Sequence, residues 1–202
     1  MTQSARKSLR AHFVGGLIFA TALLGAAAPV EVQAGGYRDG RTESGARLFR
    51  AMVAADTEIE RKADLDGSLK ILIVHAGDVE RATALGELVA KRDEQKTPEP
   101  IKGLPVRVEL WRADEVAHLG KRTIAAIFMA EALKRDQLQS LIRLGAERHV
   151  VVYSPFEGDV EKGVSGGLSI EAQVRPFVNT TALRAAQVTL KEFFLKVAKV
   201  FP

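Results

Sequence analysis

The feature that most constrains the fold is a repeated alternation of short apolar runs with amphipathic helical segments. The clearest run covers residues 69–76 (LKILIVHA) and is rich in β-branched residues, as in a strand buried on both faces. Residues 106–111, 123–129 and 149–153 also have strand character. Because helical segments separate these runs, the order predicts a single-domain α/β fold: an open, mostly parallel sheet with helices on both faces.

The helical segments are expected from the spacing of their apolar residues and from their ends. An N-terminal helix is predicted over about 44–62, after a polar, Gly-rich stretch at 35–43 that we expect to be a flexible lead-in. Asp78 is expected to cap a helix that runs to about residue 92. Gly145 is expected just beyond the end of a helix over 133–144.

The C-terminal part departs from this rhythm. Residues 166–179 look like strand material, either one long bent strand or a tight hairpin, and the sequence leaves both open. Asn179 or Thr180 is expected to start a short helix. Thr189 and Glu192 are expected to form a capping box for a last, amphipathic helix that buries its apolar side. The apolar stripe of that helix is Leu190, Phe193, Phe194, Val197, Ala198 and Phe201.

The N-terminus has the three parts of a secretory signal peptide, predicted over residues 1–34. Arg6, Lys7 and Arg10 precede an apolar run over 13–28, and Val-Gln-Ala at 32–34 offers small residues for cleavage. The apolar run of about 16 residues is shorter than the roughly 20 that span a bilayer, although a retained membrane anchor is the alternative. The chain is therefore expected in the periplasm.

Composition narrows the function of the mature chain. Removal of residues 1–34 lowers the formal charge from +4 to +2, which gives no argument for nucleic-acid binding. The remaining residues suit one domain, expected over 44–202. The chain has no Cys, so it has neither disulfides nor thiolate metal sites, and its stability must come from packing.

The most unusual stretch is 154–167 (SPFEGDVEKGVSGG), which follows a predicted strand. It should therefore lie at the carboxyl edge of the sheet, where open α/β folds bind ligands. Phe156 offers an apolar anchor and Arg175 a forked donor, both common in interfaces. The alternative is that both only close the core, or that Arg175 pairs with Glu171. The candidate ligand or partner face consists of Ser154, Phe156, Glu157, Asp159 and Arg175.

The acidic residues of this stretch are interpreted as a solvated loop rather than a calcium site, because the EF-hand spacing is missing. His75 is expected to be a hydrogen-bonded packing residue at the end of the first strand. His118 and His149 have no partners at metal-ligand spacing. On motif grounds we expect no zinc-peptidase helix, no CxxC pair and no nucleophile elbow. We assign no catalytic residue, metal or cofactor.

The chain resembles the YfiR-like family of periplasmic proteins over most of residues 44–200. The similarity begins in the first helix (GARLFRAMVAADTEIE) and is strongest in GVSGGLSIEAQVRPFVNTTALRAAQVTLKEFFLKVAKV. There the family shows a Gly-Gly pair, a strand, an Asn that begins a helix, and a final Leu-rich helix. Here these features are Gly166 and Gly167, residues 168–172, Asn179, and FLKVAK at 194–199.

The resemblance implies a non-enzymatic regulator that binds and restrains the periplasmic sensor region of a membrane signalling protein, a diguanylate cyclase or a histidine kinase. For a cyclase, release would raise cyclic di-GMP and favour biofilm. The best-known members of the family use disulfides, so redox control does not carry over to this Cys-free chain. The alternatives are a single-lobe small-molecule binding protein or ligand sensor and, third, an enzyme. Either binding function is compatible with a homodimer.

Overall fold

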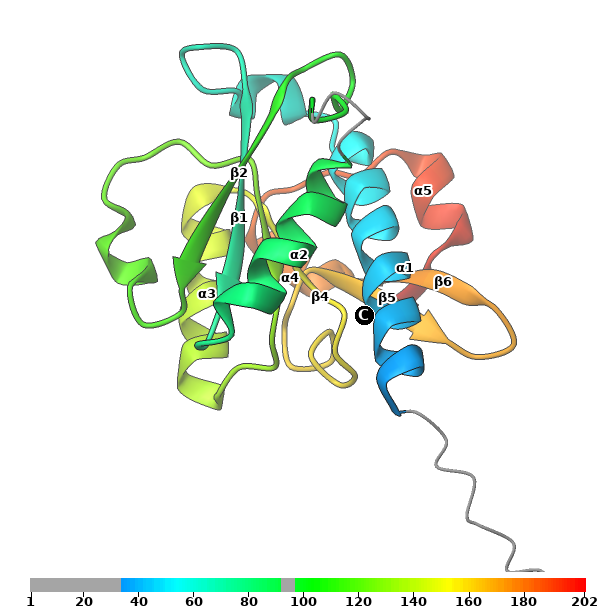
Figure 1. Cartoon of the computed structure of the whole chain (residues 1–202). Helices are drawn as coiled ribbons and strands as arrows, with labels where there is room; N and C mark the ends of the chain where they lie inside the picture. The colour runs from blue at the N-terminus through cyan, green and yellow to red at the C-terminus, as the bar shows by residue number, and fades with distance from the viewer. Residues whose placement is uncertain (1–33, 92–96) are drawn as a thin grey trace, which may run out of the picture. The chain divides into compact units, whose positions relative to one another are not determined.

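The computed structural model describes residues 34–91 and 97–202 (Figure 1). The predicted signal peptide lies outside these residues, apart from Ala34. The described residues form a seven-stranded sheet in the order β2-β1-β3-β4-β5-β6-β7. The strands are β1 (Leu69–His75), β2 (Val106–Arg112), β3 (Ala126–Met129), β4 (Val151–Ser154), β5 (Gly166–Ile170), β6 (Val174–Asn179) and β7 (Lys199–Phe201).

The sheet is mostly parallel, as the sequence predicts. Strand β1 lies parallel to both β2 and β3, and the parallel pairing continues through β4 to β5. Strands β5 and β6 are antiparallel, so residues 166–179 form a hairpin rather than one long bent strand. Strand β7 then pairs in parallel with β6 at the edge.

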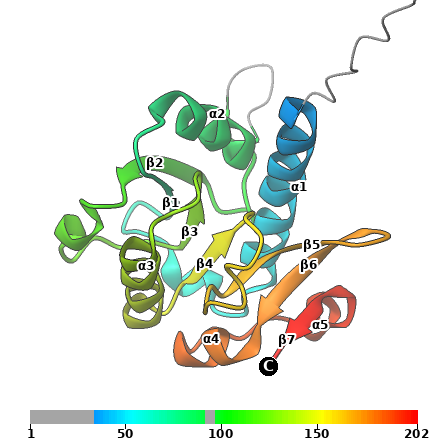
Figure 2. The same ribbon diagram turned by 90° about the horizontal axis from the view of Figure 1, so that it is seen from below.

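Helices cover both faces of the sheet (Figure 2). The α-helices are α1 (Ala34–Ala55), α2 (Val79–Ala90), α3 (Arg135–Arg148), α4 (Thr180–Ala185) and α5 (Glu192–Val197); the 3₁₀ helices are η1 (Ile59–Lys62) and η2 (Val116–Leu119). Helices α1 and α2 pack on one face, and α3 and η2 pack on the other. None of these helices combines the length and apolar character that crossing a bilayer requires.

Three buried aromatic rings fix α1 over the centre of the sheet. Phe49 of α1 meets Phe128 of β3 and Tyr153 of β4 edge-on, with ring centroids 5.2 and 5.6 Å apart. Phe128 and Tyr153 stack at 5.6 Å. Offset and edge-on contacts of this kind stabilise a core beyond the area that they bury. Helix α1 is thereby held close to the carboxyl ends of β3 and β4.

Helix α1 begins ten residues earlier than expected and ends at Ala55, so the segment predicted as a flexible lead-in at 35–43 belongs to a helix. Contacts with the rest of the fold explain its early part. The Nε atom of Arg41 donates to the carbonyl of Pro155 at 2.5 Å. Gly45 lets the helix approach closely, since a Cβ there would lie 3.1 Å from Pro155 and 3.3 Å from Leu168.

Two expectations about helix ends had different outcomes. Asp78 caps α2, because its carboxylate accepts the backbone N–H of Arg81 at 2.9 Å. Gly145, however, is not the residue that follows α3; the helix continues to Arg148, and His149 ends it with φ +57°. A Cβ at Gly145 would lie 2.5 Å from Cγ2 of Val152. This glycine therefore serves close helix–sheet packing.

The C-terminal helix is shorter than predicted. Its N-cap is Lys191 without a side-chain cap, so the capping box expected from Thr189 is wrong. Within α5 only Phe194 is buried, at 3% exposure, whereas Phe193 and Val197 are 63% and 57% exposed. Leu190, which precedes the helix, is buried as expected. The helix ends at Val197 because the following residues turn to extend the sheet as β7.

Candidate functional site

The carboxyl ends of β1 and β3 form a topological switch point. The two strands are neighbours, but β1 continues into α2 on one face of the sheet, whereas β3 continues toward α3 on the other. Connections that leave adjacent parallel strands in opposite directions open a crevice between them. Ligands of open α/β sheets bind in such crevices.

Glu131, in the connection after β3, lies in this crevice. Its Oε2 accepts the backbone N–H of Ala76 at 2.8 Å, and its Oε1 accepts that of Asp78 at 2.6 Å. Both donors belong to the connection from β1 to α2. The carboxylate therefore joins the ends of two neighbouring strands, and it lies beside the positive end of the α2 dipole.

Two arginines from different helices line the same cavity as Glu131. Arg81 of α2 donates from Nε to the carbonyl of Ala130 at 3.1 Å, and Arg41 of α1 is held by Pro155 as described above. The guanidinium carbon of Arg81 lies 6.0 Å from the ring centroid of Phe156. Neither arginine forms an ion pair within residues 34–91 and 97–202, so their terminal nitrogens are free for an anion.

These side chains border two cavities that share Arg41 and Phe156. The first has a volume of about 350 Å³ and is lined by Arg41, Thr42, Arg81, Glu131, Ala132, Pro155 and Phe156. The second, of about 410 Å³, extends toward the β5–β6 hairpin and β7. It is lined by Arg41, Phe156, Glu157, Gly158, Val160, Glu161, Leu168, Ser169, Ile170, Glu171, Phe177 and Lys199. Arg41 and Arg81, which form no ion pair within the described residues, both line the first cavity. Most of the acidic side chains, namely Glu157, Glu161 and Glu171, line the second.

Of the predicted site residues, Ser154 and Asp159 hold their loop together. The Ser154 hydroxyl donates to the Asp159 carboxylate at 2.7 Å and accepts the N–H of Phe156 at 3.1 Å. Asp159 also pairs with Lys162 at 3.1 Å. Because Ser154 is 0% and Asp159 6% exposed, the expectation of a fully solvated acidic loop is wrong for Asp159.

The other predicted residues are more open. Phe156 is half-buried and borders both cavities, and Glu157 is exposed on the wall of the second. Arg175 lies on β6 and lines neither cavity; it pairs with Glu171 at 3.1 Å, the alternative role that the sequence allows for it. Lys199 hydrogen bonds to the Glu171 carboxyl at 2.9 Å and is the main cause of its lowered pKa.

Sequence reasoning missed Arg41, Arg81 and Glu131. Arg41 lies in the stretch predicted as a flexible lead-in, Arg81 lies on a helix whose apolar face dominates the sequence pattern, and Glu131 lies in a short connection without a motif. Glu131 can be recognised as a site residue only once the strand order is known. Because β1 and β3 are neighbours, the residues that follow Met129 lie beside those that follow His75. The carboxyl edge itself was predicted, but only through the loop that follows β4.

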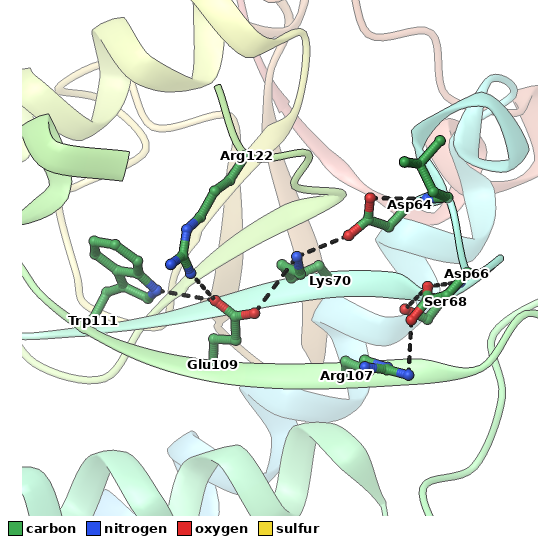
Figure 3. Close-up of polar contacts among 9 residues, drawn as sticks. Asp64, Asp66, Ser68, Lys70, Arg107, Glu109, Trp111 and Arg122 are labelled. Atoms are coloured by element: carbon green, nitrogen blue, oxygen red, sulfur yellow. Dashed lines mark hydrogen bonds and ion pairs between the residues drawn. The ribbon is translucent and has the colours of Figure 1, made fainter. Parts of the chain in front are cut away.

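A second group of charged residues lies along β1 and β2, on the α3 side (Figure 3). Lys70 bonds Asp64 at 2.9 Å and contacts Glu109 at 3.6 Å. Glu109 also accepts from the indole N–H of Trp111 at 3.3 Å and meets Arg122 at 3.4 Å. These charges neutralise one another within the fold, so we interpret the group as a brace rather than a binding site.

The pKa directions agree with that interpretation. The hydrogen bond from Lys70 lowers the pKa of Asp64, and the same bond raises the pKa of Lys70. Hydrogen bonds from the hydroxyl and backbone N–H of Ser68 lower the pKa of Asp66, which also pairs with Arg107 at 2.8 Å. The pKa shifts of Asp64, Asp66 and Lys70 thus all favour the charged form.

Another cavity, of about 510 Å³, lies between η2 and α3. Arginines on its wall are used by the fold itself: Arg148 donates to the carbonyl of Gly120, and Arg143 donates to Ser140 at 3.1 Å. It has no aromatic residue in its lining. We therefore place the candidate site at the carboxyl ends of β1, β3 and β4.

Two buried polar atoms lack hydrogen-bond partners in the described part of the chain, namely Nδ1 of His75 and the hydroxyl of Tyr153. The expectation that His75 is a hydrogen-bonded packing residue is therefore wrong for Nδ1, although the ring is buried. Burial raises the pKa of the Tyr153 hydroxyl far above its ordinary value.

Residues 163–167 (GVSGG) match the letters of a GxSxG nucleophile elbow, contrary to the expectation that no such motif occurs. They lead into strand β5 rather than into a helix, so the match is one of letters alone. The Ser165 hydroxyl is buried and accepts the backbone N–H of Val152 at 3.3 Å. No group of three His, Cys, Asp or Glu side chains suited to a metal ion occurs in the described residues.

No protein-family model matches the chain, and no curated protein matches it. Among solved structures it is similar to an ABC domain from Streptococcus pneumonia in complex with L-Trp, with a TM-score of 0.51 and 11% identity. That match covers 80% of this chain and 62% of the other. A conserved domain protein from Vibrio cholerae has a TM-score of 0.44 and 14% identity, over 70% and 59% of the two chains. The chain thus spans about three fifths of each structure's length, and at this identity the first similarity establishes the α/β fold.

Proposed function

We propose that this chain is a single-lobe binding protein that takes a small ligand with an anionic group at the carboxyl ends of β1, β3 and β4. One observation carries the proposal. Arg41 and Arg81 come from different helices, are each anchored through Nε to a backbone carbonyl, and line the same cavity of about 350 Å³. Anchored guanidinium groups lose little rotamer freedom when they bind a carboxylate.

The cavity also offers an apolar wall. Phe156 is positioned by its backbone bond to Ser154 and lies beside Arg81. Pockets for small ligands combine such apolar surfaces with a few placed polar groups. A free amino acid with an aromatic side chain satisfies both parts, and the structural neighbour from Streptococcus pneumonia was solved with L-Trp.

The test is a thermal-unfolding screen with L-tryptophan, the other free amino acids, and the matching amines that lack the carboxylate. We expect at least one amino acid to raise the Tm of the full chain, and its amine to have no effect. A ligand at about 100 times its Kd contributes about 2.7 kcal/mol.

Two variants locate the binding. Arg41→Gln and Arg81→Gln should each weaken binding by about tenfold, the effect of one lost charged hydrogen bond. Arg184→Gln, an exposed arginine on α4, is the matched control and should leave binding unchanged. If no amino acid raises Tm, or if both arginine variants bind as tightly as the wild type, the proposal is wrong.

A second function, restraint of a membrane signalling protein such as a diguanylate cyclase, is favoured by a different observation. The segment most similar to the YfiR-like family exposes Phe193, Val197 and Val200, which are 63%, 57% and 50% accessible. Exposed apolar side chains grouped on one short helix and the adjoining strand suit a protein contact.

Cellular cyclic di-GMP tests this second function. Deletion of the gene should raise cyclic di-GMP, and Phe193→Ala should do the same without a change in Tm. Phe156→Ala and Arg175→Ala test the face predicted from the sequence in the same way. If the deletion leaves cyclic di-GMP unchanged, restraint of a cyclase is excluded.

Both functions are proposed for an exported chain. Mass spectrometry of the mature protein should find an N-terminus near Gly35, as the residues before it predict. An intact Met1 on the native soluble protein would contradict a periplasmic location.

A further inference from the structure

We propose that Glu131 is an internal occupant of an anion-binding crevice, which the chain fills with its own carboxylate and thereby closes to anionic ligands. Each carboxylate oxygen accepts one backbone N–H, from Ala76 at 2.8 Å and from Asp78 at 2.6 Å. No Lys or Arg pairs with Glu131 among the described residues. Its hydrogen bonds come from two backbone donors at the start of α2, as they would for a bound anion, while Arg41 and Arg81 line the same cavity without pairing with it.

The position within the fold supports this assignment. The two N–H groups lie at the switch point between β1 and β3, where an open α/β sheet receives its ligand. Bonds other than those to Glu131 also hold this connection: the carbonyl of His75 accepts the N–H of Ala113 at 2.8 Å, and the Asp78 carboxylate caps α2 through the N–H of Arg81 at 2.9 Å. Removal of the Glu131 side chain should therefore leave both donors in place and facing the vacated space.

A consequence for specificity follows, and it rests on the proposed binding function. Glu131 lines the same cavity as Arg41 and Arg81. One ligand carboxylate can bind to the two arginines. A second negative charge on the ligand, directed toward the crevice, would be repelled by the Glu131 carboxylate. The site should accordingly prefer ligands with one carboxylate over dicarboxylates of similar size.

Acetate tests the crevice directly, because it replaces the atoms that Glu131→Ala removes. At pH 7 the full-length variant should unfold about 4 °C below the wild type, from the loss of two charge-assisted hydrogen bonds. Sodium acetate should restore at least half of that loss, measured against sodium chloride at equal ionic strength. The wild type and Glu147→Ala should show a clearly smaller acetate-specific shift, because in them acetate can meet only Arg41 and Arg81; Glu147 is exposed on α3 and gives the same charge change.

An equal acetate-specific shift in the wild type, or a variant with neither a lower Tm nor an acetate response, overturns the proposal. If Glu131→Ala does not fold, Glu131→Gln replaces it, because an amide has one accepting oxygen where the carboxylate has two. Hydrogen exchange at Ala76 or Asp78 should then accelerate about tenfold, and unchanged exchange at both overturns the proposal. Acetate rescue requires no amino-acid ligand, so failure of the binding function is seen separately.

Discussion

Gly145→Ala separates the packing role of this glycine from its helix propensity. In a helix interior the change from Gly to Ala normally adds about 1 kcal/mol of stability. Here the new Cβ would lie 2.5 Å from Cγ2 of Val152 and 3.2 Å from the carbonyl oxygen of Val150. Val152 is 1% exposed in β4, and its β-branched side chain has few rotamers to escape into.

The steric cost should therefore reach the upper end of the range for overpacked cores, about 3 kcal/mol, and exceed the propensity gain. We expect Gly145→Ala to lose about 2 kcal/mol in the free energy of unfolding, measured by urea denaturation followed by circular dichroism. Gly40→Ala is the matched control: Gly40 lies in α1, and no atom lies within 4 Å of the position that a Cβ would take there. The stability of this control should rise by up to about 1 kcal/mol. A Gly145→Ala variant as stable as the wild type would refute the reasoning.

Three further predictions concern the core and the charged brace. Phe194→Ala should cost about 3–5 kcal/mol of unfolding free energy in a urea titration, whereas the exposed Phe193→Ala should cost less than about 1 kcal/mol. Tyr153→Phe removes a buried hydroxyl without a partner and should raise thermal stability by about 1 kcal/mol. Because the hydrogen bond from Lys70 lowers the folded pKa of Asp64, its stabilisation is present above the unfolded pKa of about 3.9 and is lost as pH falls through the folded value. Asp64→Asn should therefore flatten the acid limb of the stability curve, as measured by urea titrations below about pH 5.

The sheet was largely predictable because its signals are local. The run at 69–76 is mostly apolar, as expected of a central parallel strand, and Asp78 and Asn179 cap helices through bonds to residues three positions away. Gly145 was misassigned because the same residue serves a helix end or a close contact, and only the position of Val152 decides between them. A contact such as that between Gly145 and Val152 depends on tertiary packing, so it cannot be predicted from the local sequence.

The sequence predicted where the candidate site lies in the fold, but not which residues form it. The loop after β4 was placed at the carboxyl edge by the general rule for parallel sheets. Arg41 and Glu131 were missed because each acts through a backbone group far away in the chain: Pro155 for the arginine, and the β1–α2 connection for the carboxylate. The exposure of Phe193 was missed because its helix ends after two turns and cannot bury a full stripe.

The brace on β2 also affects how the protein behaves in a concentrated solution. Strand β2 is an outer edge of the sheet, and an unprotected edge invites a strand of another molecule to add to it. The side chains of Arg107 and Glu109 are held by ion pairs with groups on the same molecule, so an approaching strand would meet fixed charges of both signs. Salt screens such pairs, and resistance to edge-to-edge aggregation should accordingly decline as ionic strength rises.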